Sequence, residues 1–327
     1  MDAVEILIKG LVLISLLFLA AAYMTLCERV LMARVQLRLG PNRTGPFGLL
    51  QPIADGIKLL TKERFQPAGV EKFTYWLAPG ISVFVALSVF MLIPFGDPIV
   101  VFGRTISLCI ADVNVGIVFL LSLSSLAVYG VVLAGWSSDN RYSLLGGLRG
   151  TAQMISYEIP MGLSLLTVVL AAGTLNLTEI VHAQKDHWFI WTNPIGFFIY
   201  LITGFAETNR APFDLPEAEQ ELTGGYHTEY GGMKFALFFL AEYVNILAVS
   251  AIAVTLFLGG WYGPGDIPLL WFFLKVALFV LFFMLVRATL PRFRYDQLMS
   301  FGWKVLVPLA TINLIVTAYF ILVVNHA

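Results

Sequence analysis

Residues 6–26 read ILIKGLVLISLLFLAAAYMTL, an apolar run interrupted by one charged residue, Lys9. About 20 mostly apolar residues in a helix cross the ~30 Å hydrocarbon layer of a membrane. The run is too long for the apolar centre of a signal peptide, and no small-residue cleavage site follows it. We therefore predict that it is the first membrane-spanning helix.

Seven further runs have similar length and composition, which predicts a helical bundle with about eight spans. Backbone N–H and C=O groups in lipid must be paired within their own segment, so each run is expected to be an α-helix. The fourth and fifth runs are the most interrupted, because they contain Pro160 and Pro194. We place the spans at residues 6–26, 75–95, 113–135, 153–172, 188–206, 234–258, 268–290 and 303–325.

The composition of the 327-residue chain agrees with an all-α membrane fold. Hydrophobic residues make up 58% and charged residues 13%, whereas a soluble domain has about 25% charged residues. The mean hydropathy is +0.83, so lipid is expected to cover much of the surface. The net charge of -1 offers no basic patch for a nucleic-acid partner. We treat residues 1–327 as a single integral membrane domain.

Lys and Arg are distributed unequally between the loops. Sixteen of the twenty lie in loops one, three, five and seven, and three lie on the other side of the predicted membrane. Loops enriched in Lys and Arg stay on the cytoplasmic side. We therefore expect the odd loops to be cytoplasmic, or matrix-facing, and both termini to lie on the opposite side.

Two of the cytoplasmic loops have unusual sequences. Loop one, 28–74, contains the turn-rich segment GPNRTGPFG at 40–48. In the following stretch, 49–63, apolar residues recur at helical spacing, which predicts an amphipathic helix in the membrane interface or a simple surface anchor. Loop five, 207–234, carries six carboxylates within 23 residues: Glu207, Asp214, Glu217, Glu219, Glu221 and Glu229.

The acids of loop five are close enough in sequence to affect one another's protonation. Asp214 and Glu217 form a capping-box pattern with Pro216 in the first turn, which predicts a short helix. Asp214, Glu217 and Glu221 would share one face of that helix. Like charges this close raise each other's pKa and keep some groups protonated, as a proton relay requires. A solvated acidic loop is the simpler interpretation.

Ionisable residues inside the predicted spans indicate more than membrane anchoring. Glu158, Glu242 and Lys275 lie in runs four, six and seven. An ionised side chain there costs roughly a few kcal/mol unless it is paired, protonated or hydrated. Pro160 removes a helical hydrogen bond close to Glu158 and could admit water. Each of these residues could instead bond a neighbouring helix.

Residues that would carry electrons or bind a nucleotide do not occur in suitable places. The two cysteines, Cys27 and Cys109, are too few for a cysteine-ligated iron–sulfur cluster. None of the four histidines falls within a predicted span, where it could ligate a haem. There is no P-loop, and no G-x-G-x-x-G motif follows a strand. We therefore expect no cofactor, no metal and no catalytic residue on this chain alone.

Two long motifs in these loops are similar to signatures of a known family. They read GLLQPIADGIKLLTKE at 48–63 and PFDLPEAEQELTGG at 212–225. Together with the eight spans, they make essentially the whole chain resemble the NADH dehydrogenase subunit 1 family, which includes the H subunit of bacterial NADH-quinone oxidoreductase (respiratory complex I). One small departure is Gly231-Gly232, where many members have Ser-Gly.

The resemblance implies a membrane subunit of a proton-translocating NADH:quinone oxidoreductase, an enzyme of the translocase type. In that family this subunit forms the membrane side of the ubiquinone chamber, and loops such as 28–74 and 207–234 line the chamber and dock other subunits. FMN and the iron–sulfur clusters belong to partner subunits. Mapped by motif, the quinone-binding candidates are Glu28, Arg29, Arg38, Asp55, Asp214, Glu217, Glu219, Glu221 and Glu229, and the proton path is Glu158, Glu207 and Glu242.

The implied partners are the peripheral-arm quinone-site subunits, other membrane subunits, quinone and membrane lipid. The implied location is a bacterial inner membrane rather than a mitochondrial one. Three alternatives stay open: the homologous subunit of a membrane-bound hydrogenase, a stand-alone proton or cation transporter, and a structural anchor. Long motif-rich loops favour a docked subunit over a transporter, and acids buried in lipid disfavour a plain anchor.

Overall fold

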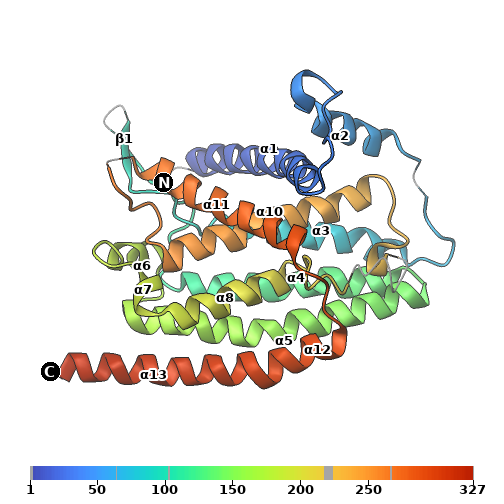
Figure 1. Cartoon of the computed structure of the whole chain (residues 1–327). Helices are drawn as coiled ribbons and strands as arrows, with labels where there is room; N and C mark the ends of the chain where they lie inside the picture. Colours follow the sequence, from blue (N-terminus) through green and yellow to red (C-terminus); the bar gives the residue numbers. More distant parts are fainter. Residues whose placement is uncertain (1–2, 64, 102–103, 217–223, 266, 327) are drawn as a thin grey trace.

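A computed structural model of the chain describes residues 3–63, 65–101, 104–216, 224–265 and 267–326. Most of its helices lie side by side in one bundle (Figure 1), which confirms the predicted all-α membrane fold. Among the described residues, the exception is a small hairpin in the loop after the second span. Its strands β1 (Ile99–Val101) and β2 (Arg104–Ile106) pair antiparallel.

Seven helices of the described residues are long and apolar enough to cross a membrane. The two chain ends lie at the same end of the bundle (Figure 1), which requires an eighth crossing besides these seven. The last span continues from α12 (Tyr295–Phe301) through the π-helical turn η3 (Gly302–Leu306). The spans are α1 (Ala3–Val35), α3 (Lys72–Val89), α4 (Gly116–Ser137), α5 (Arg141–Ala172), α10 (Met233–Phe257), α11 (Pro268–Thr289) and α13 (Val307–His326).

The fifth predicted span is shorter than expected. It forms α7 (Phe189–Thr192) and then α8 (Pro194–Glu207), whose 14 residues make about 21 Å of helix. The break lies at Asn193, whose side chain accepts a hydrogen bond from the Gly196 amide. Because α8 ends early, the loop that follows it lies within the bundle, and Arg210 in that loop is buried.

The fourth predicted span is longer than expected. α5 begins at Arg141 instead of residue 153, because Asn140 caps it by accepting a hydrogen bond from the Tyr142 amide. Pro160 lacks an amide hydrogen, yet the helix continues past it. With 32 residues, α5 is about 48 Å long, which exceeds the ~30 Å hydrocarbon layer. It is therefore long enough to project beyond the bilayer.

The loops rich in Lys and Arg lie at the end of the bundle opposite the termini (Figure 1). Loop one contains the single turn η1 (Pro46–Gly48) and the predicted amphipathic helix, α2 (Gln51–Thr61). The structure describes α2 completely, and every residue in it is at least partly exposed. Its apolar side chains Ile53, Ile57 and Leu60 are all exposed. An exposed apolar face of this kind agrees with a helix lying in the membrane interface.

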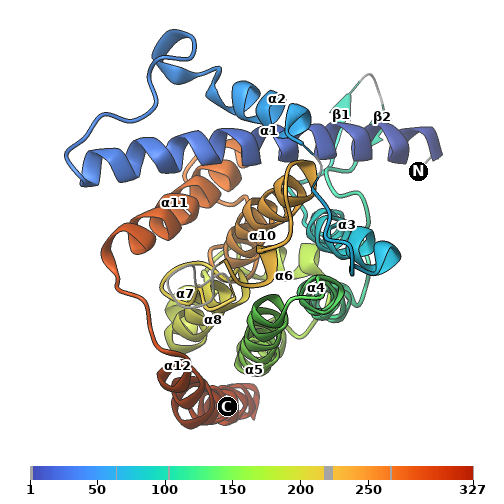
Figure 2. The ribbon, with the colours of Figure 1, turned by 90° about the vertical axis from the view of Figure 1, so that its right-hand side faces the viewer.

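The arrangement of α1 differs from that of the other spans. Figure 2 looks nearly along α3, α4, α5 and α10, whereas α1 lies across one side of them. α1 contacts α10 and α11 on one side and α2 on the other. Much of its remaining surface is exposed, including Leu7, Leu11 and Leu19.

Lys275 of α11 is buried against the end of α10. Its ammonium group donates to the backbone oxygens of Leu258, Gly260 and Tyr262 at 2.6, 3.1 and 2.6 Å. It also lies 4.4 Å from the centre of the Trp188 ring. A cation here opposes the negative end of the α10 dipole and pairs carbonyl groups of the segment that follows the helix. The geometry therefore gives this intramembrane charge a structural role.

Candidate functional site

A cluster of charged side chains is buried between α1, α10, α11 and the loop after α8. The Arg210 guanidinium binds the carboxylates of Glu28 on α1 and Glu242 on α10. It also donates to the Tyr243 hydroxyl at 3.0 Å, and Tyr243 donates to Glu28 at 2.6 Å. Arg287, near the end of α11, binds Glu28 as well. Only 5% of Glu28 and 5% of Arg210 are exposed, so these ions are largely removed from solvent.

Hydrogen bonds to the backbone before and after Arg210 hold this residue in position. After α8, Asn209 takes a left-handed φ of 51°, which turns the chain. Gln153 of α5 donates to the backbone oxygens of Ala206 and Phe213, at 2.8 Å each. The Phe213 amide donates to the Arg210 oxygen at 2.9 Å. The loop that carries Arg210 is therefore tied to α5 before and after the guanidinium.

The cluster is stable as a set because its charges cancel. Among the described residues it contains two carboxylates and two guanidinium groups. Burial alone would lower the pKa of Arg210, but Glu242 and Glu28 outweigh burial and raise it. Arg210 therefore stays charged, and each ion depends on the presence of the others.

Asp214 lies shortly after Arg210 in the same loop. Arg292, which follows α11, donates to Asp214 Oδ2 at 2.8 Å. The other oxygen, Oδ1, is buried and has no hydrogen-bond partner among the described residues. Burial raises the pKa of Asp214, although Arg292 and Arg287 act in the opposite direction. The site therefore contains a carboxyl group that can accept a further polar contact.

Other predicted quinone-site residues lie apart from this cluster. Arg29 pairs with Asp55 of α2 at 2.6 Å, which ties α1 to the amphipathic helix. Arg38 is exposed in the loop that follows α1. Glu229 accepts a hydrogen bond from Asn140, at the turn between α4 and α5, at 2.6 Å. The structure thus distributes these candidates over the end of the bundle opposite the termini, and their roles stay predictions.

Three predicted acids lie outside the described residues. They are Glu217, Glu219 and Glu221, all within 217–223. The predicted capping box and the helix face shared with Asp214 fall on the same segment. Asp214 itself lies in irregular structure before that segment.

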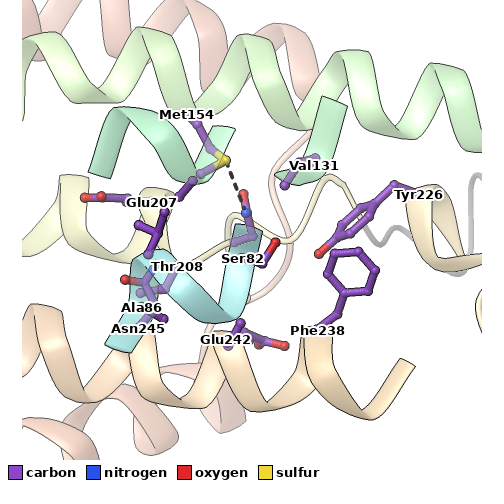
Figure 3. Close-up of a pocket in the computed structure, with 14 residues that line it drawn as sticks. Ser82, Ala86, Val131, Met154, Glu207, Thr208, Tyr226, Phe238, Glu242 and Asn245 are labelled. Atoms are coloured by element: carbon purple, nitrogen blue, oxygen red, sulfur yellow. Dashed lines mark hydrogen bonds between the residues drawn. The ribbon is translucent and has the colours of Figure 1, made fainter. Parts of the chain in front are cut away.

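Beside Glu242 the bundle encloses a cavity of about 60 Å³ (Figure 3). Its walls come from α3, α4, α5, α10 and residues 207–209. Glu207 and Glu242 line different sides of it, and Tyr226 and Phe238 lie on the side away from Glu207 (Figure 3). One water molecule needs about 10–15 Å³ of such space. The cavity therefore has room for several water molecules beside Glu242.

Two smaller cavities also border residues of the site. A cavity of about 20 Å³ shares Glu207 and Asn245 with it and reaches Ser124 of α4. Another, of about 10 Å³, lies at Glu28 and Arg210 between α1, α10 and α11. Glu28, Glu207 and Glu242 therefore each border a small cavity, and the cavity at Glu28 shares no lining residue with the other two.

Glu158 of α5 is the remaining acid of the predicted proton path. It accepts a hydrogen bond from the Ser125 hydroxyl on α4. It lies close enough to Glu207 for the two carboxylates to interact electrostatically. Glu242, Glu207 and Glu158 are thus spatial neighbours in that order, while their part in proton transfer stays a prediction.

His227 packs behind the cavity wall. It lies in the single turn η2 (Gly225–His227), and its ring contacts those of Tyr226, Phe235 and Phe238. Burial lowers the pKa of His227 to about 3. The imidazole is therefore neutral at pH 7 and forms part of the aromatic packing around the cavity.

Comparisons with known proteins identify the family. A family model described as NADH dehydrogenase matches residues 8–318. The chain belongs to the NADH dehydrogenase subunit 1 family. Among its relatives, the H subunit of NADH-quinone oxidoreductase from Protochlamydia amoebophila is 78% identical over 94% of each chain. One H subunit of this oxidoreductase from Geobacter metallireducens is 55% identical over 92% of each chain, and one from Geobacter sulfurreducens is 53% identical over 98% of this chain and 99% of its own.

In this member of the subunit 1 family, the sequence prediction omits three residues of the buried cluster. Arg210 is visible in the sequence only as the one Lys or Arg among the acids of 207–229. Arg287 enters the sequence argument only through the orientation of the spans, and Tyr243 not at all. One sequence signal could have predicted the position of Arg210, namely its place directly after a short, interrupted span. A loop after such a span enters the bundle, and a buried cation there must pair with buried acids.

Proposed function

We propose that this chain forms the membrane side of the quinone chamber in a proton-translocating NADH:quinone oxidoreductase. Its family and the names of its relatives, which are H subunits of NADH-quinone oxidoreductase, support its assignment as a membrane subunit of that complex. One observation carries the finer proposal. Arg210 joins Glu28 and Glu242 next to a cavity that Glu242 shares with Glu207.

In this proposal the chamber lies at the cytoplasmic end, between loops 28–74 and 207–234. Reducing a quinone to a quinol takes up two electrons and two protons, so the charge near the headgroup changes during turnover. Asp214 supports a polar contact there, because its Oδ1 is buried without a partner among the described residues. The interfacial helix α2 and the exposed side of α1 offer an apolar approach for the isoprenoid tail.

Coupling then follows from the shared guanidinium. Glu28 and Glu242 both hold Arg210, so a change of charge at one carboxylate alters the pairing of the other. When Glu242 takes up a proton, its attraction to Arg210 weakens, and the carboxyl group can transfer that proton to water in the adjoining cavity. Glu207 receives it across the cavity, and Glu158, hydrogen-bonded by Ser125, is the next acceptor.

The redox groups belong to partner subunits in this proposal. Cys27 and Cys109 are single free cysteines, one exposed and one buried. Within the described ranges, no group of three or more His, Cys, Asp or Glu side chains could hold a metal ion. The donor set of this chain does not fit an iron–sulfur cluster, so we assign FMN and the clusters to partners and ubiquinone, or another quinone, to the substrate.

The partners and location follow from the same assignment. The cytoplasmic loops dock the peripheral-arm quinone-site subunits, and the flanks of the bundle contact other membrane subunits. The location is a bacterial inner membrane, in line with seven apolar spans and bacterial relatives. The relatives' names describe subunits, which speaks against a stand-alone transporter. Purification under mild conditions should therefore recover this chain with partners.

Glu242→Gln and Glu207→Gln test the proposed path in membrane vesicles that contain the whole complex. Both variants should lower NADH-driven proton pumping and quinone reduction together. NADH oxidation by a water-soluble acceptor, which bypasses the membrane, should stay unchanged and shows that the complex has assembled. Glu179→Gln is the matched control, because Glu179 is an exposed acid on α6 (Leu177–Ala183) at the opposite end of the bundle.

Unchanged rates of both proton pumping and quinone reduction in the two path variants would remove these residues from the mechanism. A loss of pumping in the Glu179→Gln control as large as in the path variants would show that the assay responds to any lost acid.

A further inference from the structure

An apolar groove of about 400 Å³ lies away from the charged cluster, toward the end of the bundle that carries the termini. Val12 and Ala20 of α1 line one wall. Ala251 of α10 and Phe272 of α11 line the opposite wall, and Leu108, in the segment between α3 and α4, closes one end. The groove lies along the side of α1 that faces α10 and α11, in the half of the bundle opposite α2.

The size of the groove limits what can occupy it. A helix about 10 Å wide that crosses a ~30 Å layer occupies roughly 2,400 Å³, several times the space available. A hydrocarbon chain is only about 4 Å wide, judged from carbon–carbon contact distances. From Lys9 to Ala20 the groove follows α1 for about 16 Å. A single hydrocarbon chain therefore fits in the groove, and a partner helix does not.

The mouth of the groove carries charges of both signs. Lys9, which lines the groove, donates to the Ser107 backbone oxygen at 2.8 Å. Its ammonium group also pairs with Glu5, one helical turn closer to the N-terminus, at 2.6 Å. A zwitterionic phospholipid headgroup presents a phosphate and an ammonium group side by side. The ion pair at the mouth is complementary to that arrangement of charges.

We propose that this groove binds one acyl chain of a zwitterionic phospholipid from the leaflet on the side of the termini, with its headgroup at Lys9 and Glu5. The groove ends at Ala20 and Val276, one helical turn from Met24 and Val280, which line the small cavity at Glu28. The bound chain fills the space between α1 and its neighbours. It thereby supports the helix that carries Glu28.

The test uses vesicles that contain the intact complex and a phosphatidylethanolamine with a photoreactive group in its acyl chain. After irradiation, labelled peptides are mapped by mass spectrometry. Label should concentrate on residues 8–20 and 269–276. The double variant Val12→Phe with Ala20→Phe narrows the groove and displaces about two methylene groups of the bound chain, so its labelling should fall about tenfold.

Leu11→Phe with Leu19→Phe is the matched control. Leu11 and Leu19 are exposed neighbours on the same helix that do not line the groove. This variant should keep the labelling of the original chain. A phosphatidylglycerol probe, which lacks the ammonium group, should label the groove more weakly.

Four results would each overturn the proposal. They are equal labelling of the groove and of the opposite side of α1, undiminished labelling of the Val12→Phe with Ala20→Phe variant, loss of label when a long-tailed quinone is added, and cross-links from the groove to a neighbouring subunit in place of lipid.

Discussion

Replacing Arg210 by Met gives a quantitative test of the buried cluster. The substitution keeps a long side chain but removes the charge that binds both Glu28 and Glu242. Glu28 retains Arg287 and the Tyr243 hydroxyl. Glu242 loses the cation that binds it. The cost of Arg210→Met should therefore arise mainly at Glu242.

The expected magnitude can be worked out in two ways. Breaking a buried ion pair by removing one partner costs about 3–5 kcal/mol. Alternatively, Glu242 avoids a lone buried charge by taking up a proton. Protonating a carboxyl group of ordinary pKa ~4.3 at pH 7 costs about 3.7 kcal/mol, at ~1.36 kcal/mol per pH unit. Both routes give a destabilisation of about 4 kcal/mol.

A double-mutant cycle on the assembled complex measures this cost. The readout is the temperature at which membranes lose NADH-driven quinone reduction, together with the yield of complex. Arg210→Met should lower both. Adding Glu242→Gln should restore most of the stability, because no lone charge is left. Adding Glu28→Gln should restore less.

Two outcomes would refute this reasoning. One is an Arg210→Met variant as stable as the original chain. The other is equal rescue by Glu242→Gln and by Glu28→Gln, because the cluster geometry makes these two acids unequal.

Three further predictions follow from other contacts. Burial lowers the pKa of His227 to about 3, whereas a histidine in the unfolded chain has a pKa of ~6.5. As the pH falls, the unfolded chain therefore binds the proton first, and stability is lost below about pH 6.5. His227→Phe should flatten the fall in inactivation temperature between pH 7 and pH 5, and an unchanged slope would contradict this. Arg292→Gln removes the partner of Asp214 and a charged hydrogen bond worth about 1.5–3 kcal/mol. Quinone reduction should therefore fall about tenfold or more, while NADH oxidation by a water-soluble acceptor stays constant. A parallel loss of both rates would indicate failed assembly instead. Ser125→Ala removes the donor to Glu158 and should slow proton pumping. Ser122→Ala loses only an exposed contact to its own helix and should leave proton pumping unchanged. Equal effects of the two substitutions would exclude a specific role for the Ser125 contact.

The fold could be predicted largely because its determinants are local. The length of an apolar run and the bias of Lys and Arg between loops can be read from short windows of sequence. The two misjudged spans depended on single caps. Asn140 starts α5 early, and Asn193 interrupts the fifth run so that α8 is short. An asparagine cap is a weak sequence signal next to a long apolar run.

The site was less predictable, because its contacts join distant parts of the chain. The sequence identifies Glu28 and Glu242 as candidates, but it does not reveal that Arg210 binds both. That contact depends on Gln153, which holds the loop from a different helix. The cluster of acids in loop five suggests that their mutual repulsion raises the pKa of each. At Asp214, however, burial is the first cause of the raised pKa. Pairing between distant residues is a property of packing.

The contacts of Lys275 with the end of α10 have a consequence for substitution. Three carbonyl oxygens converge on one compact ammonium group, much as they would around a trapped inorganic cation. Arginine presents a flat fork of donors that cannot point toward three convergent oxygens. The usual conservative exchange should therefore be poorly tolerated at this position. A lysine tethered to α11 also cannot diffuse away, so the group that closes this helix end is held in place by the chain itself.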